Sequence, residues 1–83
     1  MIVSTLQGPF TGYVEGGWCR LLRGRATVVI VCDVGVEVVV AVKGKGEDRE
    51  YIFSGGDIQS LVKGRYVKVV VKGSGEGYVR LIA

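Results

Sequence analysis

Basic and aromatic side chains alternate with valines near the C-terminal end of this sequence, in a pattern suited to contact with a ligand. Tyr66, Lys68 and Lys72 share one face of a predicted strand. Tyr78 and Arg80 share one face of the following strand, and we expect the two strands to pair. Aromatic rings stack on nucleic-acid bases, while Lys and Arg neutralise phosphates. The pattern therefore predicts a face that binds single-stranded DNA or RNA.

The first part of the chain adds residues of the same two kinds. One predicted curved strand carries Tyr13 and Trp18, with Arg20 on the Trp18 side, and a predicted turn follows it. The nucleic-acid-binding residues predicted from the sequence are therefore Tyr13, Trp18, Arg20, Arg23, Arg25, Tyr66, Lys68, Lys72, Tyr78 and Arg80. The same alternation also builds any half-exposed strand, and lysines on edge strands oppose aggregation. Trp18 is equally suited to anchor a core.

Catalysis and metal binding have little support in the sequence. There is no His, the most common general base, and Cys19 and Cys32 cannot complete a zinc site alone. The acidic residues within 47–50 have cations beside them, which is typical of a solvated loop. The glycine-rich stretches 43–46 and 73–77 precede no predicted helix start and do not match a phosphate-binding loop. We therefore predict no catalytic residue, no metal site and no cofactor, and we expect a protein that is not an enzyme.

The composition favours one small folded domain, residues 1–83, with an anionic partner. Eleven Lys and Arg against eight Asp and Glu give a net charge of +3, and 48% of the residues are hydrophobic. Asp33 and Glu37 interrupt the longest apolar run before it reaches the ~18 residues of a membrane span. Residues 1–8 lack the features of a signal peptide, so we expect a cytoplasmic protein. The absence of Asn is a weak indication of a thermophile.

The stretch Ala26–Val42 is the centre of the predicted fold. Its seventeen residues include nine valines and one isoleucine, which favour a pleated strand over a helix. Asp33-Val34-Gly35 interrupts this run with residues that form turns. We therefore predict two strands, 26–32 and 36–42, joined as a tight antiparallel hairpin.

Strand and turn patterns continue on both sides of this hairpin. Residues 1–8 are predicted to be loosely ordered, and Gly16-Gly17 forms either a hairpin turn or a bulge. A charged loop at 43–50 precedes one short helix near 57–63, with Asp57 as its N-cap. The remaining predicted strands are 10–15, 18–22, 65–72 and 78–82, with turns at 23–25 and 73–77.

Two interpretations of Cys19 and Cys32 remain open. Antiparallel pairing about the turn at 23–25 would place them opposite or diagonal to each other, where a disulfide is geometrically feasible. Two small, buried, free thiols are an equally good interpretation.

The order of these elements resembles the OB-fold, a five-stranded Greek-key barrel with a helix between its third and fourth strands. The segment that carries the resemblance begins at Asp57 and contains a leucine, two further residues, a glycine, alternating valines, a turn and a final strand. This ending is similar to those of single-stranded-DNA-binding, anticodon-binding and initiation-factor-one types. The resemblance covers about residues 10–82. It implies an all-β barrel of five to six strands with one helix, and binding of single-stranded nucleic acid; an SH3-like barrel is the alternative architecture.

Two functional hypotheses follow. The first is a nucleic-acid-binding module, although Ala26–Val42 contains none of the basic residues expected on OB-fold binding strands. The second is a non-catalytic structural or assembly subunit, because Glu37–Val42 is apolar on both faces of its predicted strand. A homodimer partner or a larger complex would cover the outer face. Small OB subunits of archaeal RNA polymerase are similar to this chain in size and pattern.

Overall fold

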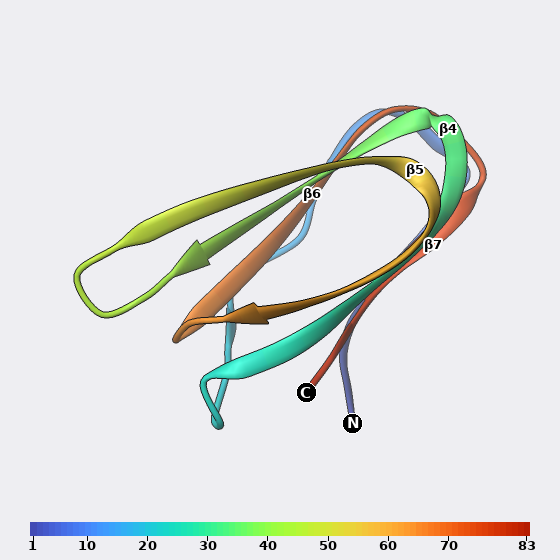
Figure 1. The fold of residues 1–83 in the computed structure, drawn as a ribbon. Coiled ribbons are helices and arrows are strands. Elements are labelled where there is room, and N and C mark those ends of the chain that lie inside the picture. Colours follow the sequence, from blue (N-terminus) through green and yellow to red (C-terminus); the bar gives the residue numbers. More distant parts are fainter.

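The protein consists of β-strands connected by short turns, in a computed structural model that describes all residues from 1 to 83. The seven strands are β1 (Ile2–Gln7), β2 (Phe10–Glu15), β3 (Cys19–Arg20), β4 (Arg25–Lys43), β5 (Asp48–Lys63), β6 (Tyr66–Gly75) and β7 (Gly77–Ile82). They form one antiparallel sheet that curls into a nearly closed barrel (Figure 1). The predicted all-β class is therefore confirmed, and the shape is compatible with an OB-like barrel. No helix that could cross a membrane is present.

The seven segments make up four long bent strands: β1 to β3 in succession, β4, β5, and β6 followed by β7. β1, β2 and β3 follow one another along one edge of the sheet, where β1 pairs with β7 and the other two pair with β6. The first half of β4 pairs with β7 and its second half pairs with β6. β5 pairs with both halves of β4 and forms the other edge. The sheet folds over near the middle of the long strands, so that its two halves face each other across the core.

Glycines are concentrated where the sheet folds over. The fold line crosses Gly8-Pro9, whose peptide bond is cis, and the segments 33–35, 54–56 and 73–77. A Cβ atom on Gly77 would collide with the carbonyl oxygen of Val31 on β4, and Gly77 has a φ of 138°, which side chains disfavour. The close approach of backbones at the bend therefore requires glycine.

The predicted valine hairpin is wrong, because residues 25–43 form the single strand β4. Asp33-Val34-Gly35 makes a bend, and the register against β5 shifts between Cys32 and Glu37. Residues that permit a chain reversal also permit a bend. β5 decides between the two, because it pairs with β4 at both of its ends and so holds it as one strand.

The predicted helix at 57–63 is also wrong, because these residues end β5. Val62 is buried and Ile58 is half-buried on the inner face, while Gln59 and Leu61 are exposed on the outer face. This is the period of a strand. A helix of two turns is marginal on its own, and pairing with β4 overrides its weak local preference.

The remaining differences follow from the same folded sheet. Residues 1–8 are not loosely held, because β1 pairs with β7 along its length. Gly16-Gly17 is a bulge, since Glu15 pairs with Val70 and Cys19 with Val67, leaving one extra residue on the first strand. The predicted loop at 43–50 is shorter, because β5 begins at Asp48. The segment 73–77 is a bend, and β6 and β7 do not pair with each other.

The core lies between the two halves of the sheet and is built from their inner faces. Its most buried side chains, all at most 1% exposed, are Val28, Ile30, Val36, Val38, Val40, Val62, Val67, Val71 and Leu81. The two cysteines pack against this core from different places. Cys19 lies opposite Val67, whereas Cys32 lies between Gly56 and Gly77, and both thiols are free. The disulfide is therefore not formed, because the strand that carries Cys19 does not pair with β4.

Candidate nucleic-acid interface

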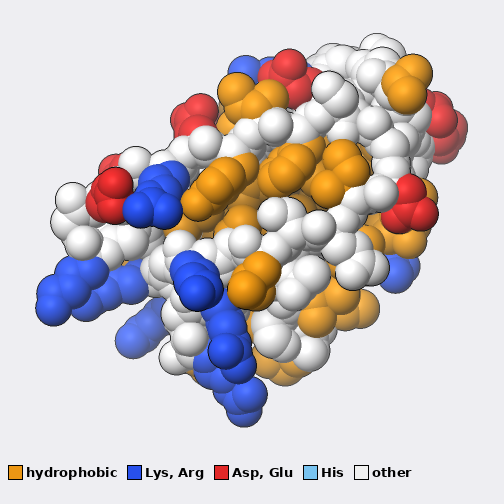
Figure 2. All heavy atoms as spheres, viewed as in Figure 1, with side chains coloured by type: hydrophobic (Ala, Val, Ile, Leu, Met, Phe, Trp, Pro, Cys, Tyr) orange, Lys and Arg blue, Asp and Glu red, His pale blue; other side chains and the backbone are white.

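One end of the barrel carries a cluster of cations without any acidic neighbour in the segments that form it. The sequence contains no Asp or Glu between residues 16 and 32 or between residues 58 and 75. The cluster, called the basic end, consists of the exposed side chains Arg20, Arg23, Arg25, Lys63 and Arg65. The protein's two salt bridges, Arg49–Glu47 and Lys68–Glu15, involve none of them. Figure 2 shows Lys and Arg gathered at the lower left and bottom of the molecule.

Two turns hold the basic end together. The turn before β4 contacts the turn between β5 and β6, where the Gly64 N–H donates to the Gly24 carbonyl at 2.9 Å. The Leu21 N–H donates to the Arg65 carbonyl at 2.7 Å. The Arg65 N–H donates to the Lys43 carbonyl at 2.8 Å, which brings the end of β4 to the same place. Backbone hydrogen bonds therefore fix the positions of the main chain that carries these cations, while their side chains extend into solvent.

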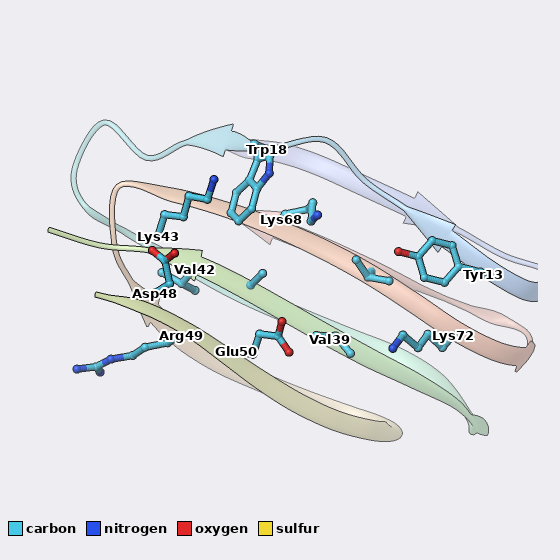
Figure 3. A pocket seen from close by; sticks show the side chains of 12 residues that line it. Tyr13, Trp18, Val39, Val42, Lys43, Asp48, Arg49, Glu50, Lys68 and Lys72 are labelled. Atoms are coloured by element: carbon cyan, nitrogen blue, oxygen red, sulfur yellow. The ribbon is translucent and has the colours of Figure 1, made fainter. Parts of the chain in front are cut away.

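A groove with aromatic and basic walls adjoins the basic end on the outer face of β4 and β6. Its floor is formed by Val39, Ala41 and Val70, and its walls carry Tyr13, Trp18, Lys43, Lys68 and Lys72 (Figure 3). The hollow has a volume of about 460 Å³, which lies within the range of small-ligand sites. Lys43 lies opposite Tyr66 in the sheet, and Tyr66 borders the basic end. The groove and the basic end therefore form one continuous surface.

Trp18 stands between two lysines in this groove. The Lys43 Nζ atom lies 4.4 Å from the centre of the indole ring, and the Lys68 Nζ atom lies 5.0 Å from it. In Figure 3 the two lysine side chains flank the ring. Trp18 is 41% exposed, so it is neither the core anchor considered from the sequence nor an unobstructed stacking surface. Lys43, which takes part in no salt bridge, can leave the ring, because a cation–π contact at an exposed site is weaker than a base–aromatic stack.

A chain of contacts connects Tyr13 to Trp18. The Tyr13 hydroxyl donates to Glu15 Oε2 at 3.1 Å, and Lys68 Nζ donates to Glu15 Oε1 at 2.6 Å. The hydrogen bond from Lys68, and then that from Tyr13, lower the pKa of Glu15. The same contacts with Glu15 raise the pKa values of Lys68 and Tyr13. Lys68 is therefore paired with Glu15 in the absence of a ligand. Lys43 and Lys72 take part in neither of the protein's two salt bridges.

The structure divides the predicted binding residues into two groups. The basic end and the groove bring together Tyr13, Trp18, Arg20, Arg23, Arg25, Tyr66, Lys68 and Lys72. Tyr78 and Arg80 lie apart from them on β7, which pairs with β1 and the first half of β4. Their predicted contact with β6 is wrong, because β4 separates β6 from β7 in the strand order. Arg80 instead lies over the ring of Tyr78, with its guanidinium carbon 4.4 Å from the ring centre.

Three cations of this surface were not singled out from the sequence. Lys63 belongs to the segment predicted as a helix, Arg65 begins the predicted strand 65–72, and Lys43 belongs to a segment predicted as a loop. A signal for the first two existed, because the segment from 58 to 75 contains cations and no acid. Lys43 carried no such signal, since it reaches the groove only through the pairing of β4 with β6.

Acidic side chains border the groove on both sides, because Glu15 contacts Tyr13 and Lys68 on the wall that carries Trp18. Asp48 and Glu50 on β5 line the wall opposite Trp18 (Figure 3). No group of three or more His, Cys, Asp or Glu side chains is arranged to hold a metal ion.

No protein-family model, curated protein or solved structure matches this chain. The geometry of this surface is therefore the basis on which a function can be inferred.

Proposed function

We propose that the protein is a small nucleic-acid-binding module whose basic end holds the phosphates of a single strand and whose groove receives one or two of its bases. The observation that carries the proposal is the set of five unpaired cations that meet at one end of the barrel, continuous with Trp18 and Tyr13. Either DNA or RNA fits this chemistry.

The electrostatic part of the proposal concerns the basic end. Its five cations lie in two touching turns or on the strand ends beside them, and no acidic side chain in those segments competes with a phosphate. Each phosphate that a cation neutralises releases counterions, with a slope of about −0.7 in a plot of log affinity against log salt concentration for single strands. Contact with four or five phosphates would give a slope of about −3.

The aromatic part of the proposal concerns the groove. Tyr13 is 60% exposed and Trp18 is 41% exposed, so both rings are accessible to a flat ligand. A base that stacks on Trp18 would displace Lys43, which is then available to an adjacent phosphate, whereas Lys68 is held by Glu15. Stacking of this kind contributes about 1–3 kcal/mol per base and requires bases that are not paired in a duplex. The groove therefore favours single strands over duplexes.

The alternative function, a structural subunit, was inferred from the apolar outer face of residues 37–42, which a partner would cover. Val39 on this face and Val70 beside it are each only 7% exposed within the single chain. These valines therefore need no partner to be removed from water.

The test is a titration of a fluorescently labelled, mixed-sequence single-stranded oligonucleotide, followed by anisotropy at several salt concentrations. Binding should weaken steeply as salt rises, and the single Trp18 should report the ligand by a salt-sensitive change in fluorescence. A duplex of the same length should compete less well than the single strand. Absence of binding to both DNA and RNA at low salt would reject the proposal.

A matched pair of charge-neutralising variants distinguishes the proposed surface from a general effect of net charge. Arg65→Gln removes one cation of the basic end, whereas Arg80→Gln removes one cation from the other half of the sheet. We expect R65Q to reduce the salt slope by about 0.7 and R80Q to leave it nearly unchanged. Equal losses in the two variants would contradict the assignment of this surface.

A further inference from the structure

β5 leaves one edge of the sheet without a partner. It pairs with β4 along its length and with no other strand, so half of its backbone N–H and C=O groups point away from the barrel. Figure 1 shows β5 folding back around an opening, and Figure 2 shows hydrophobic side chains between its two arms. Leu61 on the second arm is 57% exposed. An edge of this kind is a template for a further strand.

The second arm of β5, Asp57–Lys63, carries two charges that the chain itself leaves unpaired. Lys63 lies directly opposite Arg25 on β4, and like charges in opposed positions are unfavourable. Asp57 lies opposite Val31. Neither Asp57 nor Lys63 takes part in a salt bridge of the protein. The arm therefore presents an anion at its beginning and a cation at its end, both exposed on the outer face.

We propose that two copies of this chain pair through this arm, antiparallel, about a two-fold axis at Ser60. In this register Lys63 lies opposite the partner's Asp57, and by symmetry the same ion pair forms at the other end. Ile58 lies opposite the partner's Val62 on the inner face. Gln59 lies opposite the partner's Leu61 on the outer face, which reduces the exposure of the leucine.

The two-fold symmetry selects this register among the alternatives. Opposed residues must lie on the same face of a continuous sheet, so the axis must pass through a residue position. An axis at Leu61 would place Lys63 opposite the partner's Gln59 and would leave Asp57 without a partner. Only an axis at Ser60 brings the anion and the cation of the arm together.

The first arm of β5 offers no comparable pairing. An axis at Glu50 would place this carboxylate opposite its own copy. Arg49 is already paired with Glu47 of the same chain, at 2.9 Å. The second copy is therefore expected at the Asp57–Lys63 arm. This dimer does not require nucleic-acid binding, although Lys63 also belongs to the basic end.

Charge reversal tests the proposed ion pairs. The association of the wild-type chain and of Asp57→Lys, Lys63→Asp and the double exchange is measured by sedimentation equilibrium, with circular dichroism as a check of folding. We expect the wild type to dimerise, each single reversal to raise the dissociation constant at least tenfold, and the double exchange to restore it. A wild type that stays monomeric at about 1 mM would overturn the proposal. Equal association of the wild type and both single reversals would also overturn it.

Cross-linking tests the register without relying on charge. Ser60→Cys places a thiol next to its own copy at the axis, whereas Gln59→Cys lies opposite the partner's Leu61. Under mild oxidation we expect a disulfide-linked dimer from S60C, with the link between the two copies of position 60 identified by peptide mass spectrometry, and none from Q59C. Efficient linkage of Q59C without linkage of S60C would refute the axis at Ser60.

Discussion

Alanine substitution of four glycines separates the two reasons why this fold needs glycine, which are a positive φ angle and the close approach of another backbone. Gly17 has no positive φ, and a Cβ added there would meet no atom within 4 Å, so it serves as the reference. Gly12 has a φ of 126° but open space around it. At Gly55 a Cβ would collide with the Asp33 carbonyl oxygen, although its φ is not positive. Gly77 combines a φ of 138° with a collision against the Val31 carbonyl oxygen.

The expected losses of stability follow from these geometries. Gly17→Ala should be neutral or stabilising by up to about 1 kcal/mol, because alanine restricts the unfolded chain. Gly12→Ala should cost about 1–3 kcal/mol for its backbone conformation. Gly55→Ala should cost about 1–3 kcal/mol or more, since a backbone carbonyl cannot rotate away as a side chain can. Gly77→Ala should cost about 2–6 kcal/mol, a large part of the roughly 4–12 kcal/mol expected for a domain of this size.

Urea unfolding followed by Trp18 fluorescence and by far-ultraviolet circular dichroism measures these differences. Each kcal/mol should lower the melting temperature by about 4–8 °C in a chain of this length. If Gly55→Ala proved as stable as Gly17→Ala, the backbones of β4 and β5 would not be in contact at the bend. That result would restore the predicted hairpin around Asp33 as a serious alternative to the folded sheet.

Three further predictions concern single side chains. The pKa of Glu15 is lowered in the folded protein, so its ionised form contributes stability that is present above the pKa of an unfolded glutamate and is lost as pH falls through the lowered pKa. Glu15→Gln should remove this part of the acid sensitivity, as measured by unfolding at several pH values. Alkylation without a reductant should modify both thiols by intact mass, with Cys32 reacting at a higher pH than an ordinary thiol, because burial raises its pKa. Ile30→Val removes one methylene from a side chain that is 0% exposed, and unfolding should show a loss of about 0.5–1.5 kcal/mol.

The sequence identified the strands more reliably than the way they join. The valines of residues 26–42 specify extended backbone wherever they occur, so their assignment to strands is confirmed. Asp33-Val34-Gly35 is compatible with a reversal or a bend, and only the position of β5 decides between them. The bend was indicated only by several segments taken together. The other long strands are interrupted at matching places, by Gly8-Pro9, Ser54-Gly55-Gly56 and residues 73–77.

The candidate site was predicted in its residue types and only partly in its arrangement. Tyr66, Lys68 and Lys72 share an outer face as expected, because strand periodicity is a local property. The expected contact with Tyr78 and Arg80 depended on the assumption that consecutive strands pair. β6 and β7 instead continue one another across the bend, and each pairs with a different half of β4. Such long-range pairing cannot be read from local pattern.

The two proposed surfaces share Lys63, whereas Arg65 belongs only to the basic end and Asp57 only to the dimer, so variants at these three positions separate the two effects. In the proposed dimer Lys63 contacts the partner's Asp57, so it is less available to a phosphate than Arg65, which has no such partner. We therefore expect Lys63→Gln to weaken dimerisation and to weaken oligonucleotide binding less than Arg65→Gln does. Arg65→Gln should weaken binding alone, and Asp57→Asn should weaken dimerisation alone. Sedimentation and anisotropy on the same samples measure the two effects. If Asp57→Asn weakened oligonucleotide binding as strongly as Arg65→Gln, nucleic acid would be held by the dimer as a unit, and the basic end of a single copy would be insufficient to bind it.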